Sequence, residues 1–418
     1  MESCDSTHLK TMKKKNIIAM ALAGLAALPV IAAEDSKPTA GELLQGINMF
    51  TPEEGDPAYK VTANEKYGTQ WYVDAAYGYW QTHNAMPGTN LHNNFFLVHA
   101  ALNQRLIENS VTGGTWLRAE FSGSWALDHG SAKKSSLFAD GYGNVGYPHF
   151  DIYGPADAVL PEVAVMHYFN GGRSSVIGGM VNLTNYFDCV SIANDSFSSF
   201  ANGAFINTTI VPLPDANLGL VLQHELNESN YVMGAISRTD SHYRSNPFDF
   251  GDGNSYVIVA EWGHIFADGD ATFRFTPFYH SQDYEGAKNK STWGAAASVE
   301  YTLCDACTVF ARTGFAHSQE EGDAAELSLG THVKLIPSRE DDFLGISYGI
   351  FKGLGASAYI DEETGRPGHG REQIVEVVYS LQVNDYLRIM PHYQFIQNPA
   401  YRSAGNESIW GVQTVFSF

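Results

Sequence analysis

The sequence predicts an all-β protein, a 16-stranded antiparallel transmembrane β-barrel with short periplasmic turns and long extracellular loops. Three observations predict this fold: apolar and polar residues alternate along many short segments, short and long connections alternate between these segments, and the last segment ends on Phe418. Alternation with a period of two is the periodicity of a strand. Outer-membrane barrels combine such strands with short turns at one end and long loops at the other.

The clearest strands form a hairpin near the carboxy terminus. Between residues 387 and 396, Tyr393, Phe395 and other apolar residues alternate with His392 and other polar residues. The segment at 374–383 alternates in the same way, and the polar turn Asn384-Asp385 joins the two segments. Two period-two segments around a two-residue polar turn indicate a β-hairpin.

Further segments of this kind bring the expected number of strands to sixteen, an even number typical of a bacterial pore. The expected strands are 70–80, 95–106, 115–125, 159–169, 174–183, 218–226, 230–238, 255–266, 270–281, 290–303, 308–315, 326–335, 343–351, 374–383, 386–395 and 408–418. Short connections lie at 171–173, 228–229, 267–269, 304–307 and 384–385, and long ones at 126–158, 184–217, 239–254, 352–373 and 397–407. No helix of ordinary length is expected.

The amino-terminal region precedes this barrel. Lys13, Lys14 and Lys15 come before the apolar run 17–31, which leads into a small-residue cleavage site at 30–33 and is followed by acidic Glu34-Asp35. This pattern predicts a secretory signal peptide over 1–33, in which 1–11 resembles an upstream start or a cloning artefact. We expect 34–69 to be a polar periplasmic lead-in and 70–418 to be the transmembrane β-barrel porin domain.

Composition excludes several classes of protein. The net charge of −21 argues against nucleic acid as a partner and against binding of anionic lipid through basic patches. The chain has 17% charged residues and no apolar run of membrane-spanning length, which excludes a helical membrane protein. A β-barrel escapes hydropathy analysis because lipid-facing and lumen-facing residues alternate. The partners that we expect are therefore outer-membrane lipid and a small permeant.

The cysteines do not form a metal cluster, and no metal or cofactor is expected. Cys304 and Cys307 flank a short turn between two alternating segments. We interpret them as a disulfide across a hairpin turn in an oxidising compartment. A thioredoxin-like redox pair is the disfavoured alternative, because the surrounding βαβ pattern is missing. Cys189 stands alone in a polar stretch, and the sequence assigns it no role.

Strand parity predicts which charged residues face the lumen. A charge on the lipid-facing side near the membrane midplane costs about 2–4 kcal/mol, so charged residues opposite an apolar face are assigned inward. The resulting candidates for lining the pore and binding substrate are Arg118, Glu120, Arg274, Glu300, Arg312, Lys334, Glu376, Arg388 and His392. An alternative stays open for each of them: inward arginines and glutamates can simply pair with one another and stiffen the wall.

The long connection 184–217 is the candidate for a loop that folds into the lumen. It carries Phe187, Phe197, Phe200 and other apolar residues that require burial. The constriction-loop candidates are Asp188, Asn194 and Asp195. Arginines, carboxylates and aromatic rings together suit a neutral polyol, because charged groups hydrogen-bond hydroxyls and rings stack on the apolar faces of sugars.

Several motifs resemble the carbohydrate-selective porins of the OprB family. They are GMVNLTNYFD at 179–188, IAND at 192–195, FANGA at 200–204, DDFLGISY at 341–348, EVVY at 376–379 and PHYQFIQNP at 391–399. The resemblance spans about 164–418 and follows the family's order. Met180 stands where the family often has a basic residue, and the region before Tyr72 matches poorly.

The resemblance implies a sixteen-stranded barrel in the outer membrane of a Gram-negative bacterium, which admits neutral sugars by passive diffusion. It also implies arginine and glutamate side chains at a narrow eyelet. Whether the barrel is a monomer or a homotrimer, and whether its acidic loops bind calcium, is left open. The main alternative is a general ion-selective diffusion porin. An outer-membrane barrel enzyme, for which no Gly-x-Ser-x-Gly motif is present, and a soluble sugar-binding β protein are less favoured.

Overall fold

The computed structural model describes residues 38–52, 56–83, 92–109, 111, 113–127, 156–239, 255–282, 290–354, 370–399 and 406–418. The strands are β1 (Thr69–His83), β2 (His92–Ile107), β3 (Thr115–Ala126), β4 (Ala156–Phe169), β5 (Ser174–Val181), β6 (Asn217–Asn227), β7 (Asn230–Arg238), β8 (Tyr256–Phe266), β9 (Ala271–Gln282), β10 (Lys290–Cys304), β11 (Cys307–Ser318), β12 (Gly322–Val333), β13 (Phe343–Lys352), β14 (Glu372–Asn384), β15 (Leu387–Gln397) and β16 (Asn406–Ser417).

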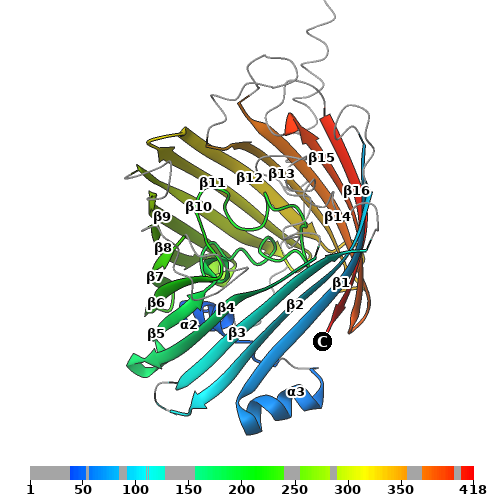
Figure 1. Cartoon of the computed structure of the whole chain (residues 1–418). Coiled ribbons are helices and arrows are strands. Elements are labelled where there is room, and N and C mark those ends of the chain that lie inside the picture. The colour runs from blue at the N-terminus through cyan, green and yellow to red at the C-terminus, as the bar shows by residue number, and fades with distance from the viewer. Residues whose placement is uncertain are drawn as a thin grey trace, which may run out of the picture.

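These strands form one closed antiparallel barrel (Figure 1). Each strand pairs with its neighbours in the sequence, and β1 pairs with β16 to close the wall. The predicted fold class is therefore confirmed. Each of the sixteen predicted segments corresponds in order to one of these strands, with ends that differ by a few residues.

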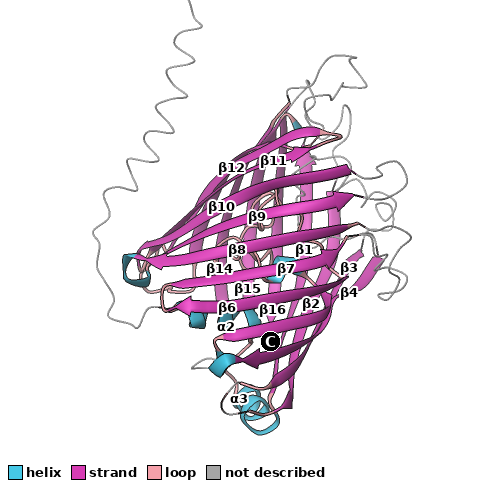
Figure 2. Ribbon diagram, turned by 90° about the vertical axis from the view of Figure 1, so that its left-hand side faces the viewer, coloured by secondary structure: helices cyan, strands magenta, loops and turns pink. Residues whose placement is uncertain are grey.

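The two faces of the wall differ as the period-two pattern requires. Large apolar side chains point outward and are exposed, among them Trp293 at 51% and Tyr393 at 45%. Their neighbours in the sequence point inward and are buried, as Thr292 and His392 show. Figure 2 shows the tilt of the strands across this wall. An exposed apolar band around a closed barrel is the surface that contacts lipid hydrocarbon in outer-membrane barrels.

Short turns gather at one end of the barrel, which we call the short-turn end. The 3₁₀ turns Asn170–Gly172 and Ala267–Gly269 lie there, together with the tight turns of the β10–β11 and β14–β15 hairpins. Gly171 adopts a φ of 68°, a left-handed conformation that glycine takes without steric cost. Figure 1 shows the carboxy terminus and α3 at this end.

A short helix lies inside the short-turn end, within the segment that we expected to be a polar periplasmic lead-in. Helix α2 (Ala40–Asn48) begins at Thr39 with a capping box, in which the Thr39 and Glu42 side chains satisfy each other's backbone N–H groups. Its buried residues Ala40 and Leu44 pack with the wall, and α2 contacts β6, β7 and β8. A nine-residue helix is marginal in isolation, so the wall supplies its stability and sequence periodicity alone does not reveal it.

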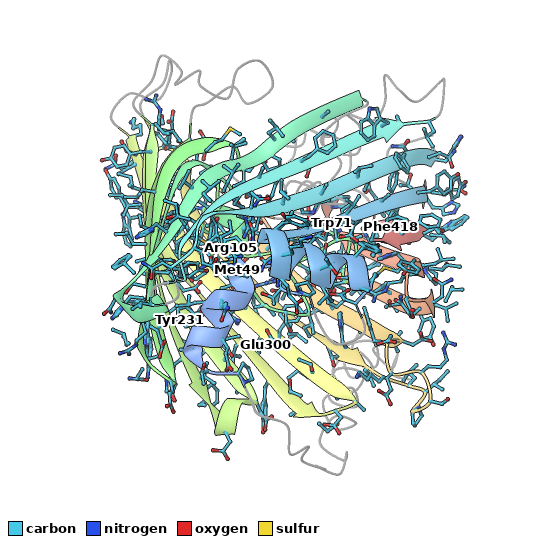
Figure 3. All side chains as sticks on the ribbon, turned by 90° about the horizontal axis from the view of Figure 1, so that it is seen from below. Met49, Trp71, Arg105, Tyr231, Glu300 and Phe418 are labelled. Atoms are coloured by element: carbon cyan, nitrogen blue, oxygen red, sulfur yellow. The ribbon has the colours of Figure 1, made fainter. Side chains whose placement is uncertain are left out.

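A second helix, α3 (Ala58–Thr62), continues into a π-helical turn (Ala63–Tyr67) that leads into β1. Figure 3 looks into the barrel from the short-turn end and shows both helices there, with Met49 near the middle of the opening. No helix among the described residues is long and apolar enough to cross a membrane. The predicted signal peptide at 1–33 lies outside the described residues.

The loop between β5 and β6 folds into the lumen, as expected for 184–217. We call residues 182–216 the constriction loop. Its aromatic side chains Phe187, Phe200 and Phe205 are fully buried against inward residues of the wall, and Phe205 packs against Phe351 of β13. A long connection is thereby folded into the barrel because it carries its own apolar side chains.

Two glycines give a test of how tightly adjacent strands pack. A Cβ atom added at Gly294 of β10 would lie 2.1 Å from the Phe315 carbonyl oxygen of β11, whereas at Gly234 of β7 the nearest atom would be 3.9 Å away. We expect Gly294→Ala to lower the free energy of unfolding in detergent by about 1–3 kcal/mol through overpacking. Gly234→Ala is the matched control, expected within about 0.5 kcal/mol of the wild type. Equal effects would contradict this packing.

Candidate functional site

Six inward glutamates on six strands hold the constriction loop. We call them the glutamate ring: Glu120 of β3, Glu162 of β4, Glu261 of β8, Glu300 of β10, Glu326 of β12 and Glu376 of β14. Every one of these carboxylates accepts a hydrogen bond from a loop residue. Glu300 is half-buried and the others are buried. Buried carboxylates need such donors, because an unpaired buried charge is strongly unfavourable.

Glu376 shows how the ring binds the loop backbone. Its two carboxylate oxygens accept hydrogen bonds from the N–H groups of Ala201 and Asn202, each at 3.0 Å. The Nδ1 atom of His392, on the neighbouring strand β15, lies 2.9 Å from the same carboxylate. In addition, the Asn202 side chain donates to Gln394 at 3.0 Å. Charge-assisted bonds to backbone N–H groups are the stronger class of hydrogen bond, so this segment is firmly positioned.

Glu326 and Glu300 hold two further stretches of the loop. Glu326 accepts hydrogen bonds from the Thr208 hydroxyl and from the backbone N–H of Thr209, the latter at 2.8 Å. Glu300 accepts one from the Ser191 N–H at 2.8 Å and lies 3.9 Å from Arg274. The loop is thus fixed at several points around the barrel.

Arg312 is the cation around which the middle of the loop folds. Its Nε atom forms an ion pair with Asp188 at 2.7 Å, and its terminal nitrogens donate to the carbonyl oxygens of Phe205 and Ala193, both at 2.7 Å. Its exposure is only 1%. Asp188 has a φ of 55° and donates its own N–H to Glu261 at 2.8 Å. This guanidinium fastens the loop and does not face open water.

Arg118 joins the loop site to the amino-terminal segment. It forms ion pairs with Glu120 at 2.9 Å and Glu162 at 3.1 Å. It also donates to the carbonyl oxygens of Ile47 at 3.1 Å and Asn48 at 3.2 Å, at the end of α2. The same two glutamates accept hydrogen bonds from the Asn185 amide. The wall, the loop and α2 therefore meet at one buried charge network.

Most predicted pore-lining residues point inward but are covered by the loop. Arg118, Glu120, Arg274, Arg312, Glu376 and His392 are all buried. In this structure these inward charges pair with one another, which is the alternative that the sequence left open. Arg388 is half-buried and donates to Gln382 at 2.8 Å and to the Ser198 carbonyl at 3.4 Å. Whether any of these residues contacts a permeant stays a prediction.

Lys334 lies one residue beyond β12, which ends at Val333, and its side chain is exposed. Its N–H donates to the carbonyl oxygen of Ala306, and a role in lining the pore stays a prediction. The predicted disulfide needs correction. Cys304 and Cys307 oppose each other across the β10–β11 turn but are free thiols, and the Cys307 sulfur lies 3.6 Å from the Thr331 hydroxyl of β12.

Cys189, to which the sequence assigns no role, belongs to the constriction loop. Its sulfur donates to the carbonyl oxygen of Asn185 at 3.3 Å. Burial raises the pKa of this thiol well above its ordinary value. A buried protonated thiol is a poor nucleophile and packs as a small apolar group.

A cavity of about 240 Å³ lies between the constriction loop and the wall formed by β2 to β4. The residues around it are mostly small and polar: His99, Ser122, Pro161, Asn182, Thr184, Asn185, Asn194, Asp195, Ser196, Ile206, Asn207, Leu213 and Asp215. We call it the lumen cavity. It includes Asn194 and Asp195, two of the predicted constriction-loop residues. The guanidinium groups of Arg118, Arg274 and Arg312 do not line it.

Hydrogen bonds fix several polar groups of the lumen cavity. Asn194 accepts from the Asn207 amide at 2.5 Å, and Asp195 accepts from the Phe197 N–H at 2.9 Å. Burial raises the pKa of Asp215 above its ordinary value. Apart from the carboxylates of Asp195 and Asp215, the lining is mainly amides and hydroxyls, which present donors and acceptors to an uncharged hydroxylated ligand.

Sequence reasoning missed most of the lumen cavity and half of the glutamate ring. Glu261 could have been found, because it is the one acidic residue in the otherwise uncharged strand β8. The cavity residues His99, Ser122, Asn182, Asn185 and Asp215 carry no local signal. They come together only through packing of the loop on the wall.

The family model of the carbohydrate-selective porins, OprB family, matches residues 265–418. The predicted resemblance to the OprB family is confirmed. The match covers β9 to β16, and therefore three members of the glutamate ring: Glu300, Glu326 and Glu376. No curated protein matches the chain.

Solved structures of outer-membrane channels share the architecture. The high-pH structure of Pseudomonas putida OprB has a TM-score of 0.67 and 13% identity, and the match covers 93% of this chain and 100% of that chain. The low-pH structure of the same protein has a TM-score of 0.53 and 11% identity, and the match covers 88% of this chain and 99% of that chain. The outer-membrane channel DcaP of Acinetobacter baumannii has a TM-score of 0.53 and 9% identity, and the match covers 84% of this chain and 97% of that chain. At these identities the likeness shows that the fold is that of outer-membrane porins.

The hydrogen bonds between the glutamate ring and the constriction loop predict that losing one of these carboxylates lowers the stability of the protein. In Glu376→Gln, one carboxylate oxygen becomes an amide NH₂, which cannot accept a hydrogen bond from Ala201 or Asn202. We expect a loss of about 1–3 kcal/mol in the free energy of unfolding, together with faster proteolysis of the constriction loop. Glu320→Gln, in the exposed turn before β12, is the control and should change neither. An unchanged Glu376→Gln variant would show that this carboxylate does not hold the loop.

Proposed function

We propose that the protein is an outer-membrane porin that lets neutral carbohydrates, mono- or oligosaccharides, diffuse passively across the membrane. The observation that carries this proposal is the lumen cavity, which lies beside the constriction loop and is lined mainly by amides and hydroxyls. The match to carbohydrate-selective porins and the shared fold with outer-membrane channels support it. The guanidinium groups that could trap an anion are paired with carboxylates beneath the loop.

The chemistry of passage follows from this lining. A sugar that enters the lumen cavity exchanges hydrogen bonds with water for bonds with residues such as Ser122, Thr184 and Asn194. The non-polar side chains of Pro161 and Leu213 offer contact to the C–H face of a sugar ring. The net gain per hydrogen bond is about 1 kcal/mol, so the sugar binds weakly and leaves readily. Conduction requires such weak binding.

The orientation in the membrane belongs to the same proposal. Outer-membrane barrels place their short turns in the periplasm and their long loops outside the cell. We therefore place the short-turn end, with α2, α3 and Phe418, on the periplasmic side of a Gram-negative outer membrane. The exposed apolar side chains of the wall, such as Leu222, Ile258 and Leu327, contact lipid.

A general diffusion porin that prefers cations is the second candidate function. The carboxylates of Asp195 and Asp215 line the lumen cavity and favour this alternative. The two candidates differ in whether a neutral sugar occupies the cavity long enough to interrupt the ion current.

Single-channel current in a planar bilayer tests the proposed function. We expect D-glucose or maltose to block the open channel in a dose-dependent way. Ser122→Leu fills the lumen cavity and removes one hydrogen-bonding hydroxyl, so its half-blocking concentration should rise about fivefold or more. Phe121→Leu, a neighbouring substitution on the opposite face of β3, is the control and should leave the block unchanged. A conducting channel indifferent to both sugars would favour the general diffusion porin.

A further inference from the structure

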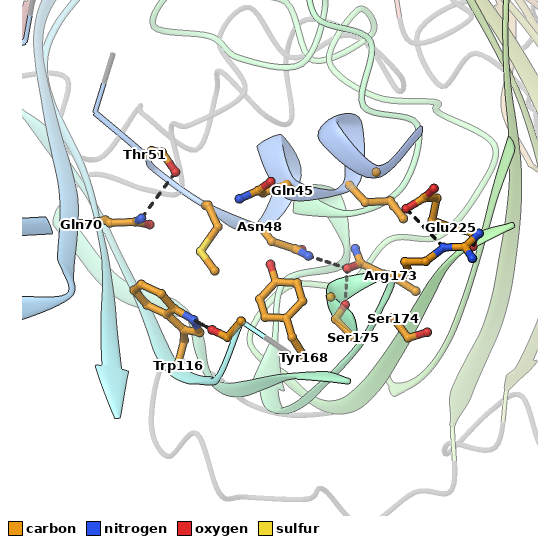
Figure 4. Close-up of a pocket in the computed structure, with 16 residues that line it drawn as sticks. Gln45, Asn48, Thr51, Gln70, Trp116, Tyr168, Arg173, Ser174, Ser175 and Glu225 are labelled. Atoms are coloured by element: carbon orange, nitrogen blue, oxygen red, sulfur yellow. Dashed lines mark hydrogen bonds and ion pairs between the residues drawn. The ribbon is translucent and has the colours of Figure 1, made fainter. Parts of the chain in front are cut away.

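A second cavity, of about 300 Å³, lies at the short-turn end and is separate from the lumen cavity. Its floor is formed by β3, β4, β5 and β6 with residues of the β2–β3 and β4–β5 turns, and its roof by α2 and the residues that follow it (Figure 4). We propose that this exit pocket binds a neutral saccharide as it leaves the channel. The inference rests on the proposed function and adds to it a binding site outside the lumen cavity.

The polar wall of the exit pocket is preorganised by amide side chains. The Asn48 amide and the Ser175 hydroxyl both donate to the Gln223 carbonyl oxygen at 2.6 Å (Figure 4). On the other side, Gln70 accepts the N–H of Phe50 at 3.1 Å and donates toward Thr51 at 3.5 Å. A site whose side chains are already locked loses little conformational entropy when a ligand binds.

Two aromatic side chains form the apolar part of the pocket. Tyr168 points toward Asn48 of α2 in Figure 4 and Trp116 lies beside Tyr168, and both side chains are largely buried. The indole N–H of Trp116 donates to the Gly113 carbonyl at 3.0 Å, which fixes the orientation of the ring. Indole and phenol rings provide flat apolar surfaces against which the C–H groups of a sugar ring can pack.

The electrostatics of the pocket favour an uncharged ligand. The two charged side chains that line it, Arg173 and Glu225, face each other across 3.7 Å and neutralise each other. The remaining polar groups are amides and hydroxyls, which donate and accept without charge. The volume lies at the lower end of small-molecule sites, about 300–1,000 Å³, and suits one sugar ring.

Gln45 makes the pocket testable without disturbing its core. It is exposed on α2, and its side-chain amide lies at the roof of the pocket (Figure 4). Gln45→Ala removes this amide and keeps a strong helix former. Gly46→Ala is the matched control on the next residue: Gly46 does not line the pocket, and a Cβ there would meet nothing within 4 Å.

The experiment is a D-glucose titration of the full-length refolded protein in detergent, followed by tryptophan fluorescence. We expect a saturable change in the wild type and in Gly46→Ala. The D-glucose concentration at half-maximal fluorescence change should rise about fivefold in Gln45→Ala, because one hydrogen bond to the sugar is lost. Trp116→Phe should abolish most of the change. Heat-modified electrophoretic mobility checks that each variant has a folded barrel.

The channel-block measurement on the same preparation separates the two claims. If D-glucose blocks the wild-type channel but Gln45→Ala titrates like the wild type, the exit pocket is overturned and the proposed function stands. A wild type that shows block but no saturable fluorescence change would overturn the exit pocket in the same way. If D-glucose neither blocks the channel nor changes the fluorescence, both claims fail.

Discussion

The structure depends on one physical requirement: carboxylates buried inside the barrel must be paired. Six glutamates face the lumen from six strands, and each receives hydrogen bonds from the constriction loop. Removing the loop would take a donor from each of these carboxylates, although Glu120, Glu261 and Glu376 would keep donors from the wall. Removing the carboxylates would leave loop N–H groups such as those of Asp188, Ala201 and Thr209 without these acceptors. Each partner therefore stabilises the other, and the loop keeps one position although it contains little regular secondary structure.

This pairing also decides what the lumen presents to a permeant. Arg118, Arg274 and Arg312 lie against carboxylates of Glu120, Glu300 and Asp188, so their charges are largely compensated locally. The lumen cavity is lined mainly by amides and hydroxyls, with Asp195 and Asp215 as its carboxylates. Under the proposed function, such a lining would recognise hydroxyl groups through many weak hydrogen bonds.

The barrel could be predicted from the sequence because strand alternation is a local property. Sixteen segments and the inward direction of Arg312 or Glu376 follow from parity alone. Parity does not reveal whether an inward side chain meets water or another part of the chain. It therefore assigned residues to the pore lining that the constriction loop in fact covers. Helix α2 was missed because its stability comes from contacts with β6 to β8.

The central claim is that Arg118, Arg274 and Arg312 are neutralised by carboxylates beneath the constriction loop. The zero-current potential of the wild-type channel in a potassium chloride gradient tests it most directly, since the sign of this potential reports the charge that mobile ions encounter. With the arginines paired and Asp195 and Asp215 open to the cavity, we expect the sign of a cation preference. A clear anion preference would show that arginine charges dominate the passage, and would contradict the account.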